Sequence, residues 1–532
     1  MRIEAIDVSV EELEQLVEQT AEGPLPPEGQ RKLRATVATI RTLAELLTEQ
    51  KITIEQLRAV LLGPRTCEKT RKVLGDDAEA AAEPADDTRG SQTNPSNSRR
   101  KGHGRNSTVA YSSAPKVAVP HPILKVKDRC PECLKGKVYP LSEEPKSMVR
   151  ITGQPPLKAT VYELETLRCN LCGEVFTPPT PAGVSEEKYD ETAVSMIALL
   201  KYGTGVPFKR MERLESHFCI PLPAATAWEI VAAGAASLAP VWDELVRQAA
   251  QGEVVHNDDT SMKILRFVRE ASDSRTGLFT TGIVSRFSGH SIALFFTGRQ
   301  HAGENLADVL KRRDEELGPP IQMCDALSRN APGSQEVILG NCLAHLRRHF
   351  VDVVNSFPDG CRYVLEVLRE VFHNDMLARE QQMGPDERLL FHQQHSSPLM
   401  DQLHAWCRQQ FDERKVEPNS GLGKAIQYLF NHWQGLTLFL RQPGAPVDNN
   451  LCERALKKAI LHRRNSLFYR TQNGARVGDL FMSLIYTAEL CGANPFDYLT
   501  ELQRHEAKVA RAPAQWLPWN YRTTLLELAL AA

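Results

Sequence analysis

The sequence contains no apolar run of about 18 or more residues and no signal peptide, since Glu4 already follows Met1-Arg2-Ile3. It also lacks a strong net charge, with 64 Lys and Arg against 66 Asp and Glu and a formal charge of −2. A contact with nucleic acid must therefore come from local basic patches. These absences disfavour a membrane protein, and we expect the protein in the cytoplasm.

A disulfide framework is also missing. Of the twelve cysteines, only four stand in Cys-x-x-Cys pairs, Cys130 with Cys133 and Cys169 with Cys172, and the scattered remainder fits a reducing compartment. Each pair makes a tight turn that can direct two thiolates at one point, and two turns complete a tetrahedral structural Zn²⁺ site. The spacing between the pairs is longer than in most zinc ribbons, and the alternating residues 159–167 predict a strand before the second pair. The alternative is two unrelated turns.

The composition is that of an ordinary folded protein, 42% hydrophobic and 24% charged, and 532 residues allow several domains. Apolar residues at three-and-four spacing over 31–62 predict either a helical hairpin or a short coiled coil. Residues 75–120 are acidic and alanine-rich, then polar, then basic over 99–105. Such a segment cannot bury enough apolar surface to offset its ordering entropy, so we expect disorder there.

The middle of the chain changes from helical to strand-rich patterns. Helices are expected over 192–202, over 207–217 and from Pro223 towards Ala236, either as a helix-turn-helix-like module or as a plain bundle. Strands are then expected at 254–256, 278–284 and 291–296, followed by a helix over 304–313, a strand at 321–325, a strand at 337–339 and a helix over 343–350. This is the element order of an RNase H-like core, so the predicted fold class is α/β.

The expected organisation follows from these patterns. It comprises an N-terminal helical or coiled-coil region (1–74), a disordered linker (75–125), a zinc-ribbon DNA-binding module (126–182), a helical module (183–250), the first part of the core (251–350), an α-helical insertion (351–445), the C-terminal helices of the core (446–500) and a helical tail (501–532).

Three acids are candidates for catalysis by divalent metal ions. Asp258 ends the first core strand, Asp325 ends the fourth, and Glu453 stands at the start of an apparent helix that carries many cations. Phosphodiester transfer needs an activated oxygen nucleophile and a stabilised leaving oxygen, which two divalent ions provide together. Hard ions such as Mg²⁺ or Mn²⁺ prefer carboxylate ligands, so the three acids are also the candidate metal ligands.

Each acid also has a simpler explanation. Asp259 could be the ligand in place of Asp258, Asp325 could cap the helix that follows it, and Glu453 could pair with Lys457 one turn later. His345 and His349 lie one turn apart and could form a zinc pair, although no third ligand is evident, or a phosphate-contacting face. The candidate DNA-binding residues are Asn449, Asn450, Arg454, Lys457, Lys458, Arg347 and Arg348.

Three segments resemble the transposase family of insertion sequence 66. The segment His256-Asn257-Asp258-Asp259-Thr260 is similar to the family's His-x-Asp-Glu-Thr segment, and 341–350 resembles its Cys-x-Ala-His-x-Arg-Arg-x-Phe segment. Asp448-Asn449-Asn450, Glu453-Arg454-Ala455-Leu456 and 464–468 resemble its C-terminal signature. The resemblance spans about residues 30–500.

The resemblance implies a bacterial DDE transposase that cuts and rejoins DNA at the ends of its own element. Carried over residue by residue, it gives Asp258, Asp325 and Glu453 as the catalytic acids. The sequence departs from the family after Asp325, where Ala326-Leu327-Ser328 replaces the usual Gly-Tyr. The implied partners are the terminal inverted repeats, target DNA, further copies of the protein on DNA and accessory proteins encoded by the element. Two other functions remain open, namely a catalytically inactive zinc-containing DNA-binding protein and a nuclease that cleaves without joining.

Overall fold

The computed structural model describes residues 122–133, 135–139, 154–168, 170, 172, 175–185, 187–268, 275–333 and 335–531. These residues belong to two compact units, one within Ala80–Thr160 and the other from Val161 to the C-terminal end. The predicted N-terminal helical region and nearly all of the predicted linker lie outside the described residues.

In the first unit, the Cys130–Cys133 pair forms a tight turn. The amide of Cys130 donates to the carbonyl of Gly136 (2.8 Å), and Arg129 forms an antiparallel bridge with Lys137. The Gly136 amide donates to Sγ of Cys133 (3.4 Å) and lowers the pKa of that thiol. The turn therefore favours the thiolate, which is the form that binds zinc.

In the second unit, the other cysteine pair is flanked by a short hairpin. Strand β1 (Leu167–Arg168) pairs antiparallel with β2 (Val175–Phe176), and Cys172 is exposed. Cys169 lies outside the described residues, so the four-cysteine zinc site stays a prediction. The strand expected over 159–167 is wrong except for its last residue. Among the described residues its side chains have no neighbouring strand or core before Leu167, as the 83% exposure of Val161 illustrates, so no described contact stabilises a pleated conformation there.

The helices expected before the core are present. They are α5 (Glu191–Ala198), which continues as the π-helix η2 (Leu199–Gly203), α6 (Phe208–His217) and α7 (Ala224–Ala250). Helix α7 runs beyond the expected end and through Pro240. Among the described helices, α7 has the length and apolar composition of a membrane span. It packs on α15, β5 and β6.

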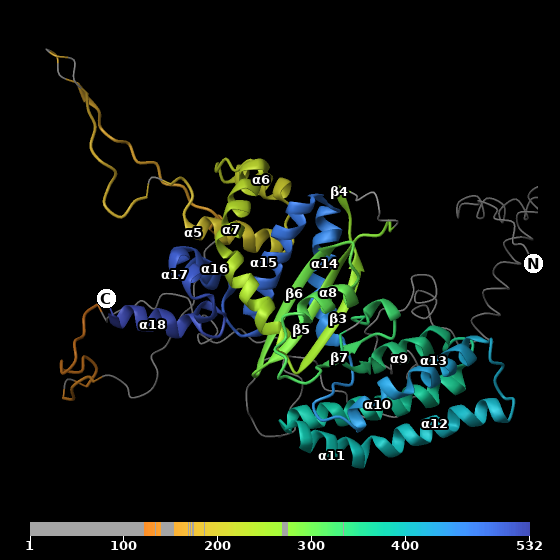
Figure 1. The fold of residues 1–532 in the computed structure, drawn as a ribbon. Helices are drawn as coiled ribbons and strands as arrows, with labels where there is room; N and C mark the ends of the chain where they lie inside the picture. Colours follow the sequence, from red (N-terminus) through yellow and green to blue (C-terminus); the bar gives the residue numbers. More distant parts are fainter. Residues whose placement is uncertain are drawn as a thin grey trace, which may run out of the picture. The chain divides into compact units, whose positions relative to one another are not determined.

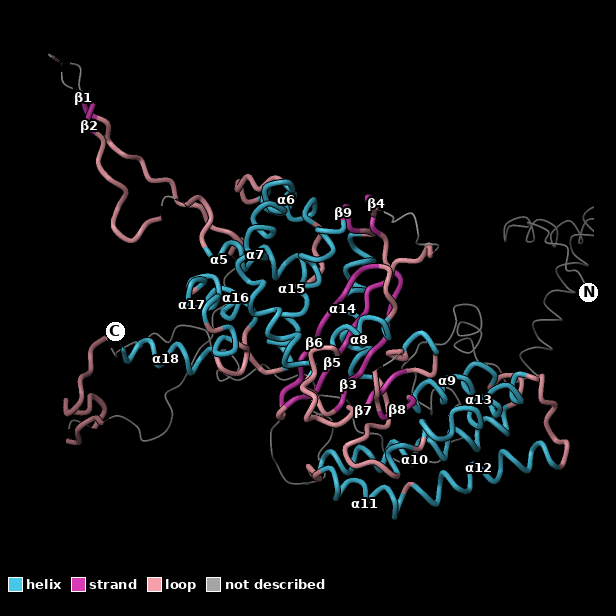
Figure 2. Tube along the Cα trace, viewed as in Figure 1, coloured by secondary structure: helices cyan, strands magenta, loops and turns pink. Residues whose placement is uncertain are grey.

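The centre of the second unit is a mixed five-stranded sheet with the order β6-β5-β3-β7-β8 (Figure 2). Its strands are β3 (Val254–Ser261), β5 (Phe279–Phe287), β6 (His290–Gly298), β7 (Ile321–Cys324) and β8 (Ile338–Asn341), with α8 (Ala302–Leu310) between β6 and β7. Strand β5 runs antiparallel to β3, and β6 runs antiparallel to β5. On the other side of β3, β7 runs parallel to β3, and β8 runs parallel to β7. The predicted α/β class and the predicted order of strands and helices are confirmed.

Helix α15 (Gln472–Leu490) closes the edge of this sheet at β6. Asp479, Ser483 and Thr487 recur every four residues along one helix face and accept from the amides of Thr297, Phe295 and Ala293 at 2.7, 3.0 and 3.0 Å. These are amides that a further strand would otherwise pair with, so the helix blocks edge-to-edge association. The other described C-terminal elements are α16 (Pro495–Arg504), α17 (Glu506–Arg511), η5 (Pro513–Trp516) and α18 (Tyr521–Ala531).

A helical bundle follows β8, in the region expected to be a helical insertion. It comprises α9 (Leu343–Val353), α10 (Pro358–Glu380), α11 (Pro385–His395), α12 (Ser397–Asp412), α13 (Gly421–Leu436) and the short η4 (Leu438–Leu440). Leu346, Phe350 and Leu368 are fully buried in its core, which also receives Ile321 and Val254 from the sheet (Figure 1). Val254 and Ile321 are the first residues of β3 and β7, so the shared core fixes the bundle to the amino-terminal ends of these two strands.

Candidate active site

Asp258 and Asp325 lie on neighbouring parallel strands. Strands β3 and β7 pair with Val254 opposite Ile321 and His256 opposite Met323. Continued by two residues, this register brings Asp325 opposite Asp258. Residues opposite each other in a parallel pair point to the same face of the sheet, so both carboxylates face the same side. The sequence had suggested that Asp258 ends its strand. Asp258 lies within β3 instead, because β3 continues its pairing with β5 as far as Ser261.

Glu453 comes to this face on helix α14 (Asn450–Ser466). Asp258 pairs across the sheet with Gly282 of β5, and α14 packs directly over that glycine. A Cβ atom at Gly282 would lie 3.0 Å from Cδ2 of Leu456 and 3.5 Å from Sγ of Cys452. The Cys452 thiol also donates to the Gly282 carbonyl (3.2 Å). The missing side chain therefore lets the helix carry Glu453 close to the strand that carries Asp258.

Polar side chains fix α14 to β3 near both of its ends. At the start, Nδ1 of His256 donates to Oδ1 of Asn449 (3.1 Å), and Nδ2 of Asn449 donates to the carbonyl of Asn257 (3.1 Å). Near the end, Arg463 donates to the hydroxyls of Thr260 (3.0 Å) and Ser261 (2.8 Å). Burial lowers the pKa of His256 to about 4, so its ring is a neutral donor at neutral pH. The position of Glu453 is thus set by contacts on both sides of it.

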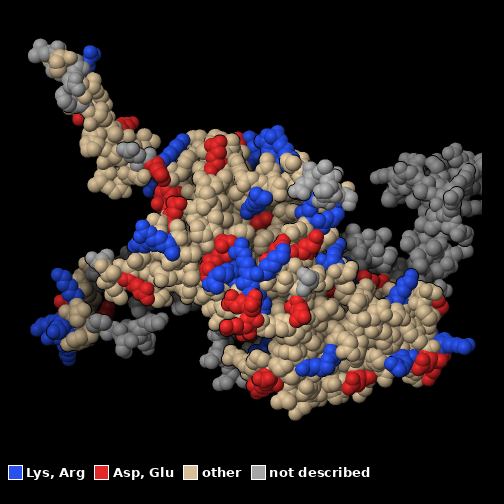
Figure 3. All heavy atoms as spheres, in the orientation of Figure 1, with Lys and Arg blue, Asp and Glu red and all other residues tan. Residues whose placement is uncertain are grey.

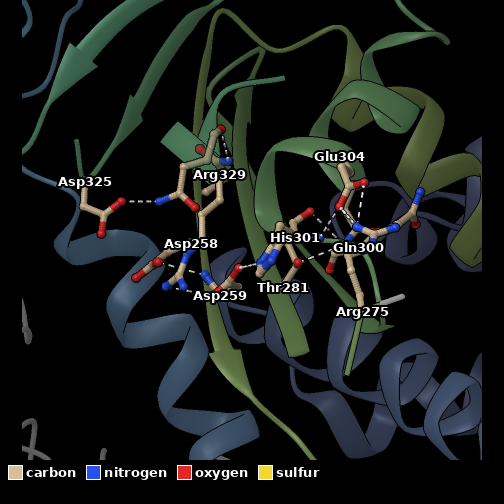
Figure 4. Close-up of polar contacts among 12 residues, drawn as sticks. Asp258, Asp259, Arg275, Thr281, Gln300, His301, Glu304, Asp325 and Arg329 are labelled. Carbon is tan, nitrogen blue, oxygen red and sulfur yellow. Dashed lines mark hydrogen bonds and ion pairs between the residues drawn. The ribbon is translucent and has the colours of Figure 1, made fainter. Parts of the chain in front are cut away.

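The structure favours Asp258 over Asp259 as the metal ligand. Adjacent residues of a strand point to opposite faces, so Asp259 faces the side of α8. There its oxygens contact Nδ1 of His301 (2.9 Å) and a guanidinium nitrogen of Arg329 (3.3 Å), as Figure 4 shows. Its side chain is 1% exposed. Asp259 is therefore a paired, buried acid that cannot approach Glu453.

The electrostatics of Asp258 reflect the crowding of acids. Burial, together with the nearby carboxylates of Asp325, Asp259 and Glu453, raises its pKa to about 7. Like charges held together in a partly buried site favour either a proton or a cation. An all-carboxylate donor set suits Mg²⁺ or Mn²⁺, and such an ion would relieve this repulsion.

Neither of the simpler explanations for the other two acids holds. Asp325 accepts from the amide of Leu327 (3.4 Å) and from the side chain of Asn330. It does not cap the 3-10 helix η3 (Ser328–Asn330) that follows it, because the N-cap residue of that helix is Leu327 and no side chain caps it. The expected ion pair of Glu453 with Lys457 is wrong. Both residues are described, and Glu453 lies beside His345 instead (Nδ1 to Oε1, 3.8 Å), a contact that is an ion pair only when the ring is protonated.

A group that sequence reasoning missed adjoins Glu453. Ligand atoms of Cys342, His345 and Glu453 all lie within 4.8 Å of one another. His349, the other member of the zinc pair considered above, is not part of this group, and its ring packs on Tyr428 (4.2 Å between centroids). The Cys342-x-x-His345 spacing at a helix start was a signal in the sequence, but nothing in the sequence placed Glu453 beside it.

The candidate DNA-binding residues divide by exposure. Arg348, Arg454 and Lys457 are exposed, and Arg347 and Asn450 are partly so. Lys458 binds Glu489 (2.9 Å) across to α15. The prediction that Asn449 contacts DNA is wrong, because the residue is fully buried and both the oxygen and the nitrogen of its side-chain amide form hydrogen bonds within the protein. On the face seen in Figure 3, basic side chains are interspersed with acidic ones, as expected for a nearly neutral chain.

Replacing Gly282 with valine is expected to separate Glu453 from Asp258. The new side chain must displace Leu456, which should cost about 1–3 kcal/mol of unfolding free energy. A shift of α14 by a fraction of an ångström to an ångström should lower any activity of the acids about a hundredfold. Gly298→Ala is the control, since no heavy atom lies within 4 Å of a Cβ at that position. Thermal unfolding and DNA cleavage of both variants test this, and wild-type activity in Gly282→Val would contradict it.

A mixed sheet with carboxylates gathered at its parallel strands is typical of enzymes that transfer phosphoryl groups with divalent ions. The model of the family described as "Transposase IS66 family" matches residues 187–477, which span the sheet, the helical bundle and α14. This protein belongs to the IS66 transposase family.

Two relatives from Sinorhizobium fredii (strain NBRC 101917 / NGR234) align over most of the chain. The protein named "Uncharacterized protein y4jD" is 26% identical over 431 residues, which cover 75% of this chain and 80% of the relative. The protein named "Uncharacterized protein y4hP" is 24% identical over 521 residues, which cover 91% of this chain and 90% of the relative.

Proposed function

We propose that this protein is a DDE transposase that cleaves DNA at the ends of its element and joins those ends to target DNA. The observation that carries the proposal is the gathering of three acids from distant segments. Asp258 and Asp325 share one face of the sheet, Glu453 comes over it on α14, and the carboxylates of Asp325 and Glu453 both act electrostatically on Asp258. The fold that goes with this proposal is an RNase H-like core interrupted by a helical insertion.

Asp258, Asp325 and Glu453 would hold two Mg²⁺ or Mn²⁺ ions. When bound, such ions activate an oxygen nucleophile and stabilise the leaving oxygen in an in-line displacement. The three acids would hold these ions, while His256, Asn449 and Arg463 keep α14 and Glu453 in register with β3. The first nucleophile is water, and the second is the 3′-hydroxyl that cleavage has produced.

The remaining modules would hold the DNA. We assign 126–182 to a zinc-ribbon module with Cys130, Cys133, Cys169 and Cys172 as ligands, and 183–250 to a helix-turn-helix-like module. The exposed Arg348, Arg454 and Lys457 would contact phosphates near the acids. Joining two element ends needs two active sites, so we expect at least a dimer on DNA, acting in the cytoplasm on the nucleoid.

A strand-transfer assay tests the proposal. The purified full-length protein is incubated with labelled DNA that carries the element's inverted repeats, a supercoiled target and Mg²⁺. Nicking at the 3′ end of the repeat and a joined product are expected, and a scrambled repeat serves as the control. Cleavage without joining would indicate a nuclease. End binding that is unchanged without metal, together with no nicking, would indicate an inactive DNA-binding protein, and either result would overturn the proposal.

A further inference from the structure

The Cys342, His345 and Glu453 group is built from three elements that meet at one end of the sheet. Cys342 directly follows β8 and is the N-cap residue of α9, His345 lies one turn along that helix, and Glu453 comes from α14. The thiol is fully buried, whereas the side chains of His345 and Glu453 are 26% and 25% exposed. The group is therefore closed on the sulfur side and accessible to solvent on the other.

The donor atoms of this group have room for another partner. Nδ1 of His345 is buried and has no hydrogen-bond partner among the described residues, and its 3.8 Å separation from Oε1 of Glu453 is too long for a hydrogen bond. A buried ring nitrogen without a partner is costly, which points to a ligand that the protein binds there. The sulfur of Cys342 accepts from the backbone amide of Asn449 (3.1 Å) at the start of α9, which fixes the direction of the thiol group. Burial raises the pKa of this thiol, so the thiol keeps its proton until an ion binds.

We propose that Cys342, His345 and Glu453 form a site for Zn²⁺ or a similar borderline ion, beside the acid pair of Asp258 and Asp325. Sulfur, nitrogen and oxygen donors together suit zinc and not magnesium, which prefers oxygen ligands alone. In a tetrahedral zinc site the sulfur and nitrogen ligands lie about 3.5 Å apart. The present separations within 4.8 Å need only side-chain adjustments to reach that geometry.

Three protein ligands leave a fourth position open, which is the pattern of a zinc site that also binds water or a substrate atom. Binding replaces the thiol proton of Cys342, and that proton leaves to solvent. The site goes beyond the proposed reaction, although it shares Glu453 with it. Metal binding here does not require that the protein cut DNA.

Cobalt titration of the full-length protein tests the site. Co²⁺ bound to a thiolate gives a charge-transfer absorption band, and zinc content per chain gives the stoichiometry. Wild type is expected to hold one ion per chain more than Cys342→Ser, and His345→Ala and Glu453→Gln are expected to weaken cobalt binding at least about tenfold. The predicted four-cysteine site contributes equally to all of these proteins, so the difference reports on this site alone.

Three controls separate ligation from folding and from catalysis. Cys452→Ser changes another buried thiol beside the sheet, His349→Ala changes the neighbouring histidine of the same helix, and both should keep the wild-type signal. Asp258→Asn should keep it as well, even if it abolishes DNA cleavage, so failure of the proposed reaction leaves this test intact. Equal stoichiometry and equal spectra in wild type, Cys342→Ser and His345→Ala would overturn the proposal, as would an equal loss of signal in Cys452→Ser.

Discussion

Asp258→Asn, Asp325→Asn and Glu453→Gln should each lower end cleavage by about a thousandfold or more. Each change removes one charged ligand of the proposed ions, and the ions provide most of the stabilisation of a phosphoryl-transfer transition state. That loss corresponds to about 4 kcal/mol of activation free energy. Initial rates of nicking on labelled element ends in Mg²⁺ measure the effect.

Two comparisons make the result specific. Binding of the element ends should survive all three substitutions, because none of the acids is proposed to contact DNA directly. Asp308→Asn is the matched control, since Asp308 is an exposed acid of α8 that pairs with Lys311 (2.7 Å). Full cleavage activity in Asp258→Asn or Glu453→Gln would end the proposed assignment of the acids.

Asp258→Asn should also stabilise the metal-free protein at about pH 8, by up to about 4 kcal/mol at about 1.4 kcal/mol for each pKa unit. The pKa of Asp258 rises from 3.8 to about 7 on folding, chiefly through burial and the nearby carboxylate of Asp325. The folded protein therefore binds a proton that the unfolded chain has lost. Wild-type stability should fall as pH rises from about 4 to about 7, and the variant should escape that loss.

Chemical unfolding without added divalent ions measures this pH dependence. At about pH 3 the two proteins should be nearly equally stable, because the wild-type acid is then largely protonated in both states. Asp259→Asn is the contrast, since it removes the charge that His301 and Arg329 contact and should destabilise the protein at neutral pH. An Asp258→Asn variant less stable than wild type at about pH 8 would show that Asp258 is held by favourable contacts, like its neighbour.

The core elements could be predicted because their patterns are local. Alternating or continuous apolar runs marked β3, β5, β6 and β7, but the strand ends differ from those expected, since Asp258 lies within β3 and Asp325 follows the last residue of β7. The expected strand over 159–167 failed for the opposite reason. Its alternation was regular, but no partner strand or core lies beside most of it, and β structure depends on such neighbours.

The contacts of individual side chains could not be predicted, because they join segments far apart in the chain. Lys457 is one turn from Glu453 and was the expected partner, yet His345 of another helix takes that place. Asn449 stood in a basic segment and was expected to contact DNA, whereas burial makes it a link between His256 and the backbone of β3. Local spacing cannot show which face of a helix meets the sheet.

The sequence by itself determined the α/β class, the order of the elements and the three acids, because hydrophobic periodicity and residue chemistry are properties of short segments. The tertiary structure alone decided which acid of the Asp258–Asp259 pair faces α14, how Gly282 admits that helix, and that Cys342 and His345 lie beside Glu453. Those outcomes depend on strand register and helix packing between residues that are distant in the chain. These contacts are therefore set only when the complete core has folded.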